Sequence, residues 1–264
     1  MLDPQPLSAD ISPQGSETKG SLALMRLRRA FICCELVPGS IIAEAELADR
    51  FQLGRAGVRA ALARLEVEGF VRPAARAGWQ VAPVTGASIG DLCRAWRMIG
   101  HGLAHTATTS AMASQLLAQA GMADALLGRT EWAVVQARRA MVRDFLLMLG
   151  QAAGRLVLSW VRLNLDLADR LIHCFERDHP RLGGTAMTPL ARALAAGDPD
   201  AAAACFAGWC DHLQAWLGEC LTRCDEMVMH FAEASQASAG AAVAPRSIKK
   251  PAKGHSNPNR QGTA

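Results

Sequence analysis

Hydrophobic residues recur at helical spacing along most of the chain, but the periodic segments are short before Pro83 and long after it. Apolar positions three to four residues apart are typical of helices that bury one face. The elements predicted before Pro83 are helices over residues 22–36, 43–51 and 55–68 and a β-hairpin over residues 70–84. Gln52-Leu53-Gly54 forms a short corner between the second and third helices. This spacing favours a helix-turn-helix followed by a small wing.

After Pro83 the pattern is almost entirely helical. The predicted helices cover residues 88–109, 112–127, 130–152, 155–175, 189–196 and 199–231. Ser88 with Asp91 is the predicted capping box of the first of them, and Asp198 followed by Pro199 marks the start of the last. The chain is therefore predicted to be mainly α, with a winged helix-turn-helix of three helices and a small β-hairpin before an all-helical part.

The predicted third helix places two arginines on a face that otherwise carries only small side chains. Its apolar stripe, which we expect to pack against the two preceding helices, consists of Val58, Ala61, Leu62 and Leu65. Arg55 and Arg59 lie on another face, beside alanines at positions 56, 60 and 63. Small side chains allow a helix to enter the major groove, and arginines reach phosphates or guanine edges. The face therefore predicts contact with double-stranded DNA.

The distribution of charge supports this interpretation more than the net charge of +4 does. Residues 19–84 hold ten Lys or Arg and six Asp or Glu, and residues 235–264 hold five basic residues and no acidic one. Such clustering is expected where the first part of the chain binds a polyanion. A solvated helix face is the alternative for the two arginines, but Arg72 and Arg76 in the following hairpin favour DNA.

The segment containing LRRAFICCELVPGS, AELADRFQLGRAGVRAALARLEVEGFV and RAGWQVAP resembles the winged helix-turn-helix of the GntR family of bacterial transcription regulators. The resemblance covers about residues 22–84 and includes the Pro-Gly turn, Glu-x-x-Leu-Ala and Arg-x-x-Val-Arg-x-x-Leu-x-x-Leu-Glu. The DNA-contacting residues that it implies are Arg55, Ala56, Gly57 and Arg59 on the helix and Arg76 and Gly78 at the wing tip.

Four positions depart from the family pattern. Gly54 stands in place of a capping serine, Ala56-Gly57 in place of Thr-Pro, and Ala60 in place of Glu. Glycine instead of serine at a cap costs only about a few tenths of a kcal/mol. Gly57 in the first turn costs up to ~1 kcal/mol, and a hydroxyl that would bond phosphate is lost. We therefore expect weaker DNA binding or an unusual operator.

The helical part resembles, more weakly, the FCD type of effector domain of the FadR subfamily. The resemblance covers about residues 88–222 and is clearest in RDFLLMLGQAAG and LARALAAGDPDAAAACF. It implies an antiparallel helical bundle that dimerises and encloses a pocket, in which many members hold a divalent metal that binds a carboxylate effector. The positions of the Asp and His ligands correspond here to Val142, Leu146, Met187 and Trp209. Such side chains cannot bind a hard cation, so we expect neither a metal nor another cofactor.

Two interpretations of this pocket remain open. The substitutions either create an apolar pocket for a neutral, aromatic or acyl effector, or fill the space and leave only a dimerisation module. Arg97 lies where the family often places an arginine, which makes it a candidate partner for a carboxylate effector, and His101 continues its helix face. His101 and His105 have metal-ligand spacing, with Asp144 as a third candidate, but two such histidines are more often satisfied or exposed to solvent.

Other function classes lack their sequence signals. We find no nucleophile elbow, paired catalytic carboxylates or phosphate-binding glycine loop, so we do not expect an enzyme. Neither a spanning apolar segment nor a signal-peptide pattern is present, which favours a cytoplasmic protein without membrane contact. The eight cysteines form no CxxC pair, and we expect small buried thiols in a reducing compartment.

These observations predict a disordered tail over residues 1–20, a DNA-binding domain over 21–84, a helical effector-binding and dimerisation domain over 85–233, and a disordered basic tail over 234–264. The predicted function is a homodimeric, ligand-responsive regulator, expected to be a repressor, that binds a pseudo-palindromic operator. The alternative is a dimeric interaction module with a degenerate effector pocket and only non-specific DNA binding.

Overall fold

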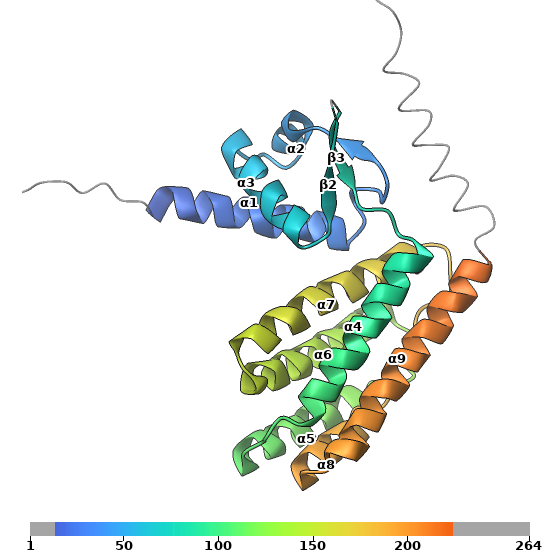
Figure 1. The fold of residues 1–264 in the computed structure, drawn as a ribbon. Helices are drawn as coiled ribbons and strands as arrows, with labels where there is room; N and C mark the ends of the chain where they lie inside the picture. Colours follow the sequence, from blue (N-terminus) through green and yellow to red (C-terminus); the bar gives the residue numbers. More distant parts are fainter. Residues whose placement is uncertain (1–13, 76, 224–264) are drawn as a thin grey trace, which may run out of the picture.

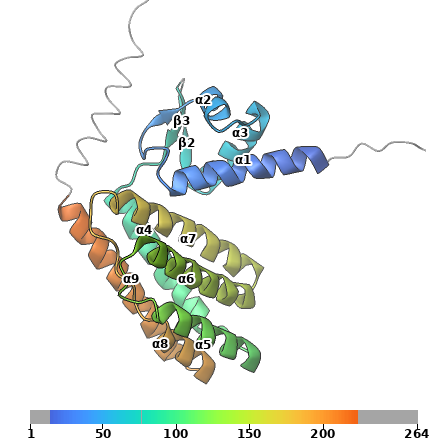
Figure 2. The ribbon, with the colours of Figure 1, turned by 180° about the vertical axis from the view of Figure 1, so that it is seen from behind.

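The computed structural model describes residues 14–75 and 77–223, and the side chains from residue 20 onward. Figure 1 shows an N-terminal unit of short helices and strands beside a bundle of longer helices. The two parts meet where α1 (Gln14–Ile32) packs against α7 (Arg155–Phe175), which lie side by side in both ribbon views (Figures 1 and 2). The predicted mainly α fold, with a winged helix-turn-helix followed by a helical part, is confirmed.

The N-terminal unit consists of α1, β1 (Ile41–Ile42), α2 (Glu44–Arg50), α3 (Arg55–Val67), β2 (Val71–Ala74) and β3 (Gly78–Val81). The sheet is antiparallel in the order β1-β3-β2, so the predicted hairpin gains a third strand. In this register Gln80 of the central strand β3 lies between Ile41 of β1 and Arg72 of β2. A two-residue strand has no detectable period, and the sequence therefore gave no signal for β1.

The core of this unit lies between α1, α3 and the sheet. The predicted apolar stripe of α3 is confirmed, since Val58, Ala61, Leu62 and Leu65 are buried. The rings of Phe31 and Phe70 lie 6.2 Å apart at its centre. At the corner before α3, Gln52 adopts a left-handed conformation with φ of 51°. A backbone hydrogen bond from the Leu53 N–H to the Ala48 carbonyl at 2.9 Å closes this corner between α2 and α3.

The bundle consists of α4 (Gly86–Ala104), α5 (Ser110–Asp124), α6 (Trp132–Ala153), α7, α8 (Thr188–Ala196) and α9 (Pro199–Thr222). The predicted cap of α9 is confirmed, because the Asp198 side chain accepts from the Ala201 backbone N–H at 3.0 Å. The capping box of α4 is formed by Thr85 and Ser88, whereas the sequence prediction paired Ser88 with Asp91. Thr85 precedes the first helical turn and reaches the Ser88 N–H, so it occupies the cap position that we had assigned to Ser88. The predicted end of α9 at residue 231 falls outside the described residues.

Helix α7 contributes to both parts of the molecule. Its Leu163 and Leu167 pack against the core of the N-terminal unit, while Val161 and Leu165 belong to the core of the bundle. In the described part of the chain, none of the helices is long and apolar enough to cross a membrane. The two parts are thus joined through one helix that is buried on opposite faces.

Candidate functional site

The candidate DNA-reading surface is the beginning of α3. Arg55 is its first residue and is exposed, and it makes neither an ion pair nor a hydrogen bond with the residues that the structure describes. Ala56 beside it is exposed and Gly57 is half-buried. Gly54 caps the helix without a side-chain hydrogen bond, as its lack of a hydroxyl requires. The helix start therefore presents backbone N–H groups and one guanidinium to solvent, an arrangement suited to a phosphate.

Arg59 lies one turn further and is held by Glu44 at the start of α2. Its Nε and Nη2 donate to Glu44 Oε2 at 3.1 and 2.9 Å, while 73% of its side chain remains exposed. Trp79 of β3 also donates its indole N–H to Glu44, at 3.4 Å. The hydrogen bond from Arg59 is the main reason why the pKa of Glu44 lies below its ordinary value. Glu44 thus orients Arg59, while the Nη1 of Arg59 has no hydrogen-bond partner in the described chain.

The wing follows directly after α3. Arg72 on β2 donates from Nε to Gln80 Oε1 on β3 at 2.8 Å. Gly78 begins β3 with φ of 99°, and a Cβ there would lie 2.6 Å from the carbonyl oxygen of Ile42. Only glycine fits this close approach of β1 to β3. Arg76, predicted at the wing tip, lies outside the described residues.

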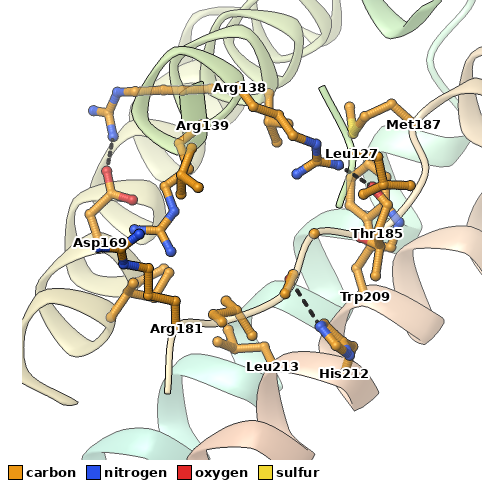
Figure 3. A pocket seen from close by; sticks show the side chains of 18 of the residues that line it. Leu127, Arg138, Arg139, Asp169, Arg181, Thr185, Met187, Trp209, His212 and Leu213 are labelled. Atoms are coloured by element: carbon orange, nitrogen blue, oxygen red, sulfur yellow. Dashed lines mark hydrogen bonds and ion pairs between the residues drawn. The ribbon is translucent and has the colours of Figure 1, made fainter. Parts of the chain in front are cut away.

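A second candidate site is a cavity of about 380 Å³ inside the bundle. It lies between α6, α7, α9 and the connection from α7 to α8 (Figure 3). Its apolar wall includes Val142, Leu146, Met187 and Trp209, the four positions where the family resemblance implies metal ligands. None of these side chains can supply the oxygen or nitrogen ligands of a divalent cation, so the wall does not fit the implied metal.

Five arginines also line the cavity: Arg138, Arg139 and Arg143 on α6, Arg181 on the connection before α8, and Arg129 before α6, which pairs with Glu131. Arg139 is paired with Glu176 at 2.9 Å, and Arg143 Nη1 lies 2.9 Å from Asp169 Oδ2. Arg181 donates to the carbonyl of Thr130 at 2.7 Å and lies over the ring of Trp132.

Arg138 differs from the other cavity arginines in its buried Nε. Like Arg181 it forms no salt bridge with a carboxylate of the described chain, although the charge of Asp124 acts on it from a distance. It donates to the carbonyl oxygen of Thr185, as Figure 3 shows, and its Nε is buried without a hydrogen-bond partner. Burial is the main cause that lowers the pKa of Arg138 below its ordinary value. A partly buried guanidinium with an unpartnered Nε and no salt bridge, beside an apolar wall, is the arrangement that an anion would stabilise.

Arg97 and His101, which the sequence placed at the pocket, lie outside this cavity. Arg97 on α4 pairs with Asp211 at 2.5 Å and hydrogen-bonds Gln214 at 3.2 Å on α9. His101 lines a shallow depression with Arg97, on a different part of the bundle. The rings of His101 and His105 are 4.8 Å apart, but the described chain contains no group of three His, Cys, Asp or Glu side chains placed to hold a metal.

Sequence reasoning missed the cavity arginines, although a signal was present. Arg139 and Arg143 are four residues apart and share a helix face with Val142 and Leu146. The family motif drew the assignment to residues from Val142 onward. Arg138 and Arg139 precede that motif and Arg143 lies within it between the two presumed ligand positions, and none of the three was considered as a pocket residue.

Comparison with known proteins agrees with this architecture. Residues 23–81 match the family model described as bacterial regulatory proteins, gntR family. A solved structure described as a transcriptional regulator GntR from Rhodococcus sp. RHA1 is 20% identical, with a TM-score of 0.54 over 78% of this chain and 98% of that chain. The E. coli protein McbR/YncC is 16% identical, with a TM-score of 0.55 over 76% of this chain and 97% of that chain. No curated protein matches the chain.

Residues 23–81 therefore form a helix-turn-helix domain of the GntR type. The fold of that domain together with the helical part is shared with the Rhodococcus and E. coli proteins over most of their length. The matched family consists of regulatory proteins rather than enzymes.

Proposed function

We propose that this protein, whose first domain is a GntR-type helix-turn-helix, is a cytoplasmic transcription regulator of the FadR subfamily with an FCD-type helical domain. It binds a pseudo-palindromic operator as a homodimer and acts as a repressor. A small anionic molecule in the bundle cavity changes its affinity for DNA. The affinity for DNA changes by the ratio of the affinities with which that molecule binds the DNA-bound and the free form of the protein.

The DNA-binding part of the proposal depends on the start of α3. Arg55 is exposed without a partner in the described chain, and the neighbouring positions are small, so the helix can approach base edges closely. Arg59 is already oriented by Glu44, which reduces the side-chain entropy lost on binding. A dimer would place two such helices in successive major grooves, about one helical turn apart.

The ligand part depends on Arg138, and this single observation carries it. The cavity combines apolar walls with a guanidinium that has a buried Nε without a hydrogen-bond partner and no salt bridge to a described carboxylate. Its volume of about 380 Å³ lies within the usual range for ligand pockets. We therefore assign the ligand as an apolar monoanion, such as an aromatic or acyl carboxylate, bound by arginine rather than through a metal. Arg138 takes the role that the sequence had suggested for Arg97.

The experiment that tests DNA reading is selection of genomic fragments by the purified full chain at near-physiological salt. We expect recovery of one short palindromic sequence. Arg55→Ala should reduce retention of that sequence at least about fivefold, because a bidentate base contact is worth about 1–3 kcal/mol. Arg94→Ala is the matched control, since Arg94 is an exposed arginine of α4 paired with Asp91.

Operator reading would be overturned if both variants retained DNA to the same extent, without sequence preference and in a salt-sensitive manner. Gly54, Ala56 and Gly57 would then mark a recognition helix that no longer reads bases, and the interaction module would be the better description.

A further inference from the structure

A continuous series of charged side chains runs from the cavity wall to the end of the DNA-reading helix. It consists of Arg143 on α6, Asp166 on α7, Arg28 on α1 and Glu68, which caps the C-terminal end of α3. We refer to these four residues as the ionic chain. They come from four different helices and both parts of the molecule, so their contact is a product of the tertiary fold.

The contacts in the ionic chain are close at every step. Arg143 Nη2 lies 2.5 Å from Asp166 Oδ1. The other oxygen, Asp166 Oδ2, is 3.0 Å from Arg28 Nη1. Arg28 Nη2 in turn lies 2.6 Å from Glu68 Oε2. Each oxygen of Asp166 therefore serves a different part of the protein, one the cavity wall and the other the N-terminal unit.

Burial makes Asp166 sensitive to the loss of either arginine. Only 8% of its side chain is exposed, against 32% for Arg143. A buried carboxylate that loses one of two ion-pair partners is strongly destabilised, because water cannot replace the missing donor. A change at Arg143 therefore reaches Asp166 without being screened by solvent, as it would be at the surface.

Arg143 is also the member of the ionic chain that lines the cavity, together with Asp169 and Ala168 of α7. Its Nη1 lies 2.9 Å from Asp169 Oδ2, so its guanidinium is shared between Asp169 and Asp166. An anion in the cavity would compete with both carboxylates for this one guanidinium.

We infer that Asp166 couples the cavity to the DNA-reading helix: when an anion draws Arg143 away from Asp166, the hold of Asp166 on Arg28 and Glu68 weakens and α3 becomes less firmly placed. The ligand step rests on the proposed function. The coupling between Arg143 and α3 does not, because it depends only on the ionic chain.

A separate contact keeps the two parts together while this happens. Arg170, one turn after Asp166 on α7, donates to the carbonyl oxygen of Ala82 and lies 5.9 Å over the ring of Phe70. Arg170 does not line the cavity. A disturbance of Asp166 therefore loosens the attachment of α1 and α3 without separating the N-terminal unit from α7.

The coupling is testable by amide hydrogen exchange on the full chain, without knowledge of the operator or the natural ligand. In Arg143→Met we expect amides of α3 and of the second half of α1 to exchange about threefold to tenfold faster than in wild type. Arg139→Met is the matched control: it removes the same charge from the same helix and cavity, but Arg139 pairs with Glu176, outside the ionic chain. Its α3 should exchange as in wild type.

Asp166→Asn supplies the second arm, because it is isosteric and removes the shared carboxylate. It should accelerate exchange in α3 like Arg143→Met, and the double variant should exchange no faster than Asp166→Asn alone. Equal exchange of α3 in Arg143→Met and Arg139→Met would overturn the inference, as would effects that multiply in the double variant. If Arg143→Met accelerates exchange in α9 as much as in α3, the variant is destabilised as a whole and Asp166→Asn decides the question. Exchange of α3 at the wild-type rate in Asp166→Asn would then overturn the coupling.

The ligand step is tested with anilinonaphthalene sulfonate, a fluorescent apolar monoanion. Its binding to wild type should accelerate exchange in α3, and its binding to Asp166→Asn should not accelerate it further. A probe that binds the cavity without changing α3 in wild type would overturn the inference and leave the ligand assignment intact. If the probe does not bind while Arg143→Met still accelerates α3, the coupling holds and the proposed ligand class is wrong.

Discussion

The carboxylate of Asp124, the last residue of α5, accepts a hydrogen bond from the backbone N–H of Thr188 at 2.8 Å, where α8 begins. Its other oxygen accepts from the N–H of Met187 at 2.7 Å. A helix distant in sequence thus supplies the N-terminal cap that α8 lacks in its own preceding residues. The contact also holds Met187 in the cavity wall.

Asp124→Asn should lower the free energy of unfolding by about 1–3 kcal/mol, because two backbone donors lose a charged acceptor. Burial acts to raise the pKa of Asp124, but hydrogen bonds from Thr188 and Met187 outweigh it, and the pKa lies below its ordinary value. Its contribution is therefore complete above the unfolded-state pKa and is lost as pH falls through the lower folded-state pKa. Urea unfolding across the acid range should show the variant losing less stability than wild type as pH falls. Asp200→Asn, at an exposed carboxylate of α9, should leave that pH dependence unchanged.

Gly78→Ala should destabilise the wing by about 1–3 kcal/mol, since the new Cβ would meet the Ile42 carbonyl oxygen and the backbone would remain in a left-handed region. Thermal unfolding followed by circular dichroism measures the change. Gly102→Ala is the control, because Gly102 lies within α4 and a Cβ there meets nothing within 4 Å. It should be neutral or stabilise the protein by up to ~1 kcal/mol. Equal melting temperatures for both variants would contradict the close approach of β1 to β3.

Arg138→Met should weaken the binding of anilinonaphthalene sulfonate at least tenfold, because it removes the cavity guanidinium whose Nε is buried without a partner. Fluorescence titration at constant ionic strength gives the dissociation constants. Arg97→Met, at the arginine that sequence resemblance favoured, should bind the probe as wild type does. The opposite ranking of the two variants would return the anion site to α4.

Glu44→Gln should increase retention on non-specific duplex DNA about threefold at low salt, because it removes a negative charge beside Arg59 and frees that guanidinium for a phosphate. The logarithm of the binding constant should also depend more steeply on the logarithm of salt concentration, by about one released counterion. Glu46→Gln provides the control, since Glu46 is an exposed carboxylate on the same helix. A similar gain in both variants would mean that only net charge matters and that the pair with Arg59 does not.

Periodicity was sufficient for elements that bury a continuous face. It located α3 and its stripe of Val58, Ala61, Leu62 and Leu65, because packing against α1 imposes a 3.6-residue repeat that is visible in the sequence. Local chemistry was equally informative at Asp198 and Pro199, where the cap and the first helical residue are neighbours in the chain.

The rest depends on contacts between residues far apart in sequence. The strand β1 exists because Ile41 and Ile42 pair with β3, and two residues alone carry no pattern. Arg97 and Arg138 both lie on helices that carry further arginines, and only the packing of α4 against α9 shows that Arg97 is already paired with Asp211. The ionic chain joins residues 28, 68, 143 and 166, whose separation in sequence gives no indication of contact.

The shared carboxylate of Asp166 limits how freely the two parts of this protein can be recombined. A DNA-reading domain grafted from another regulator onto this bundle would have to bring its own equivalent of Arg28 and Glu68, or Asp166 would be buried opposite an empty position. In the proposed coupling, chimeras that keep these two residues retain the connection between the cavity and α3, whereas those that replace them should fold around α7 but have an α3 that no longer responds to the cavity. The boundary between the bundle and the N-terminal unit therefore runs through a side chain as well as through the linker between β3 and α4.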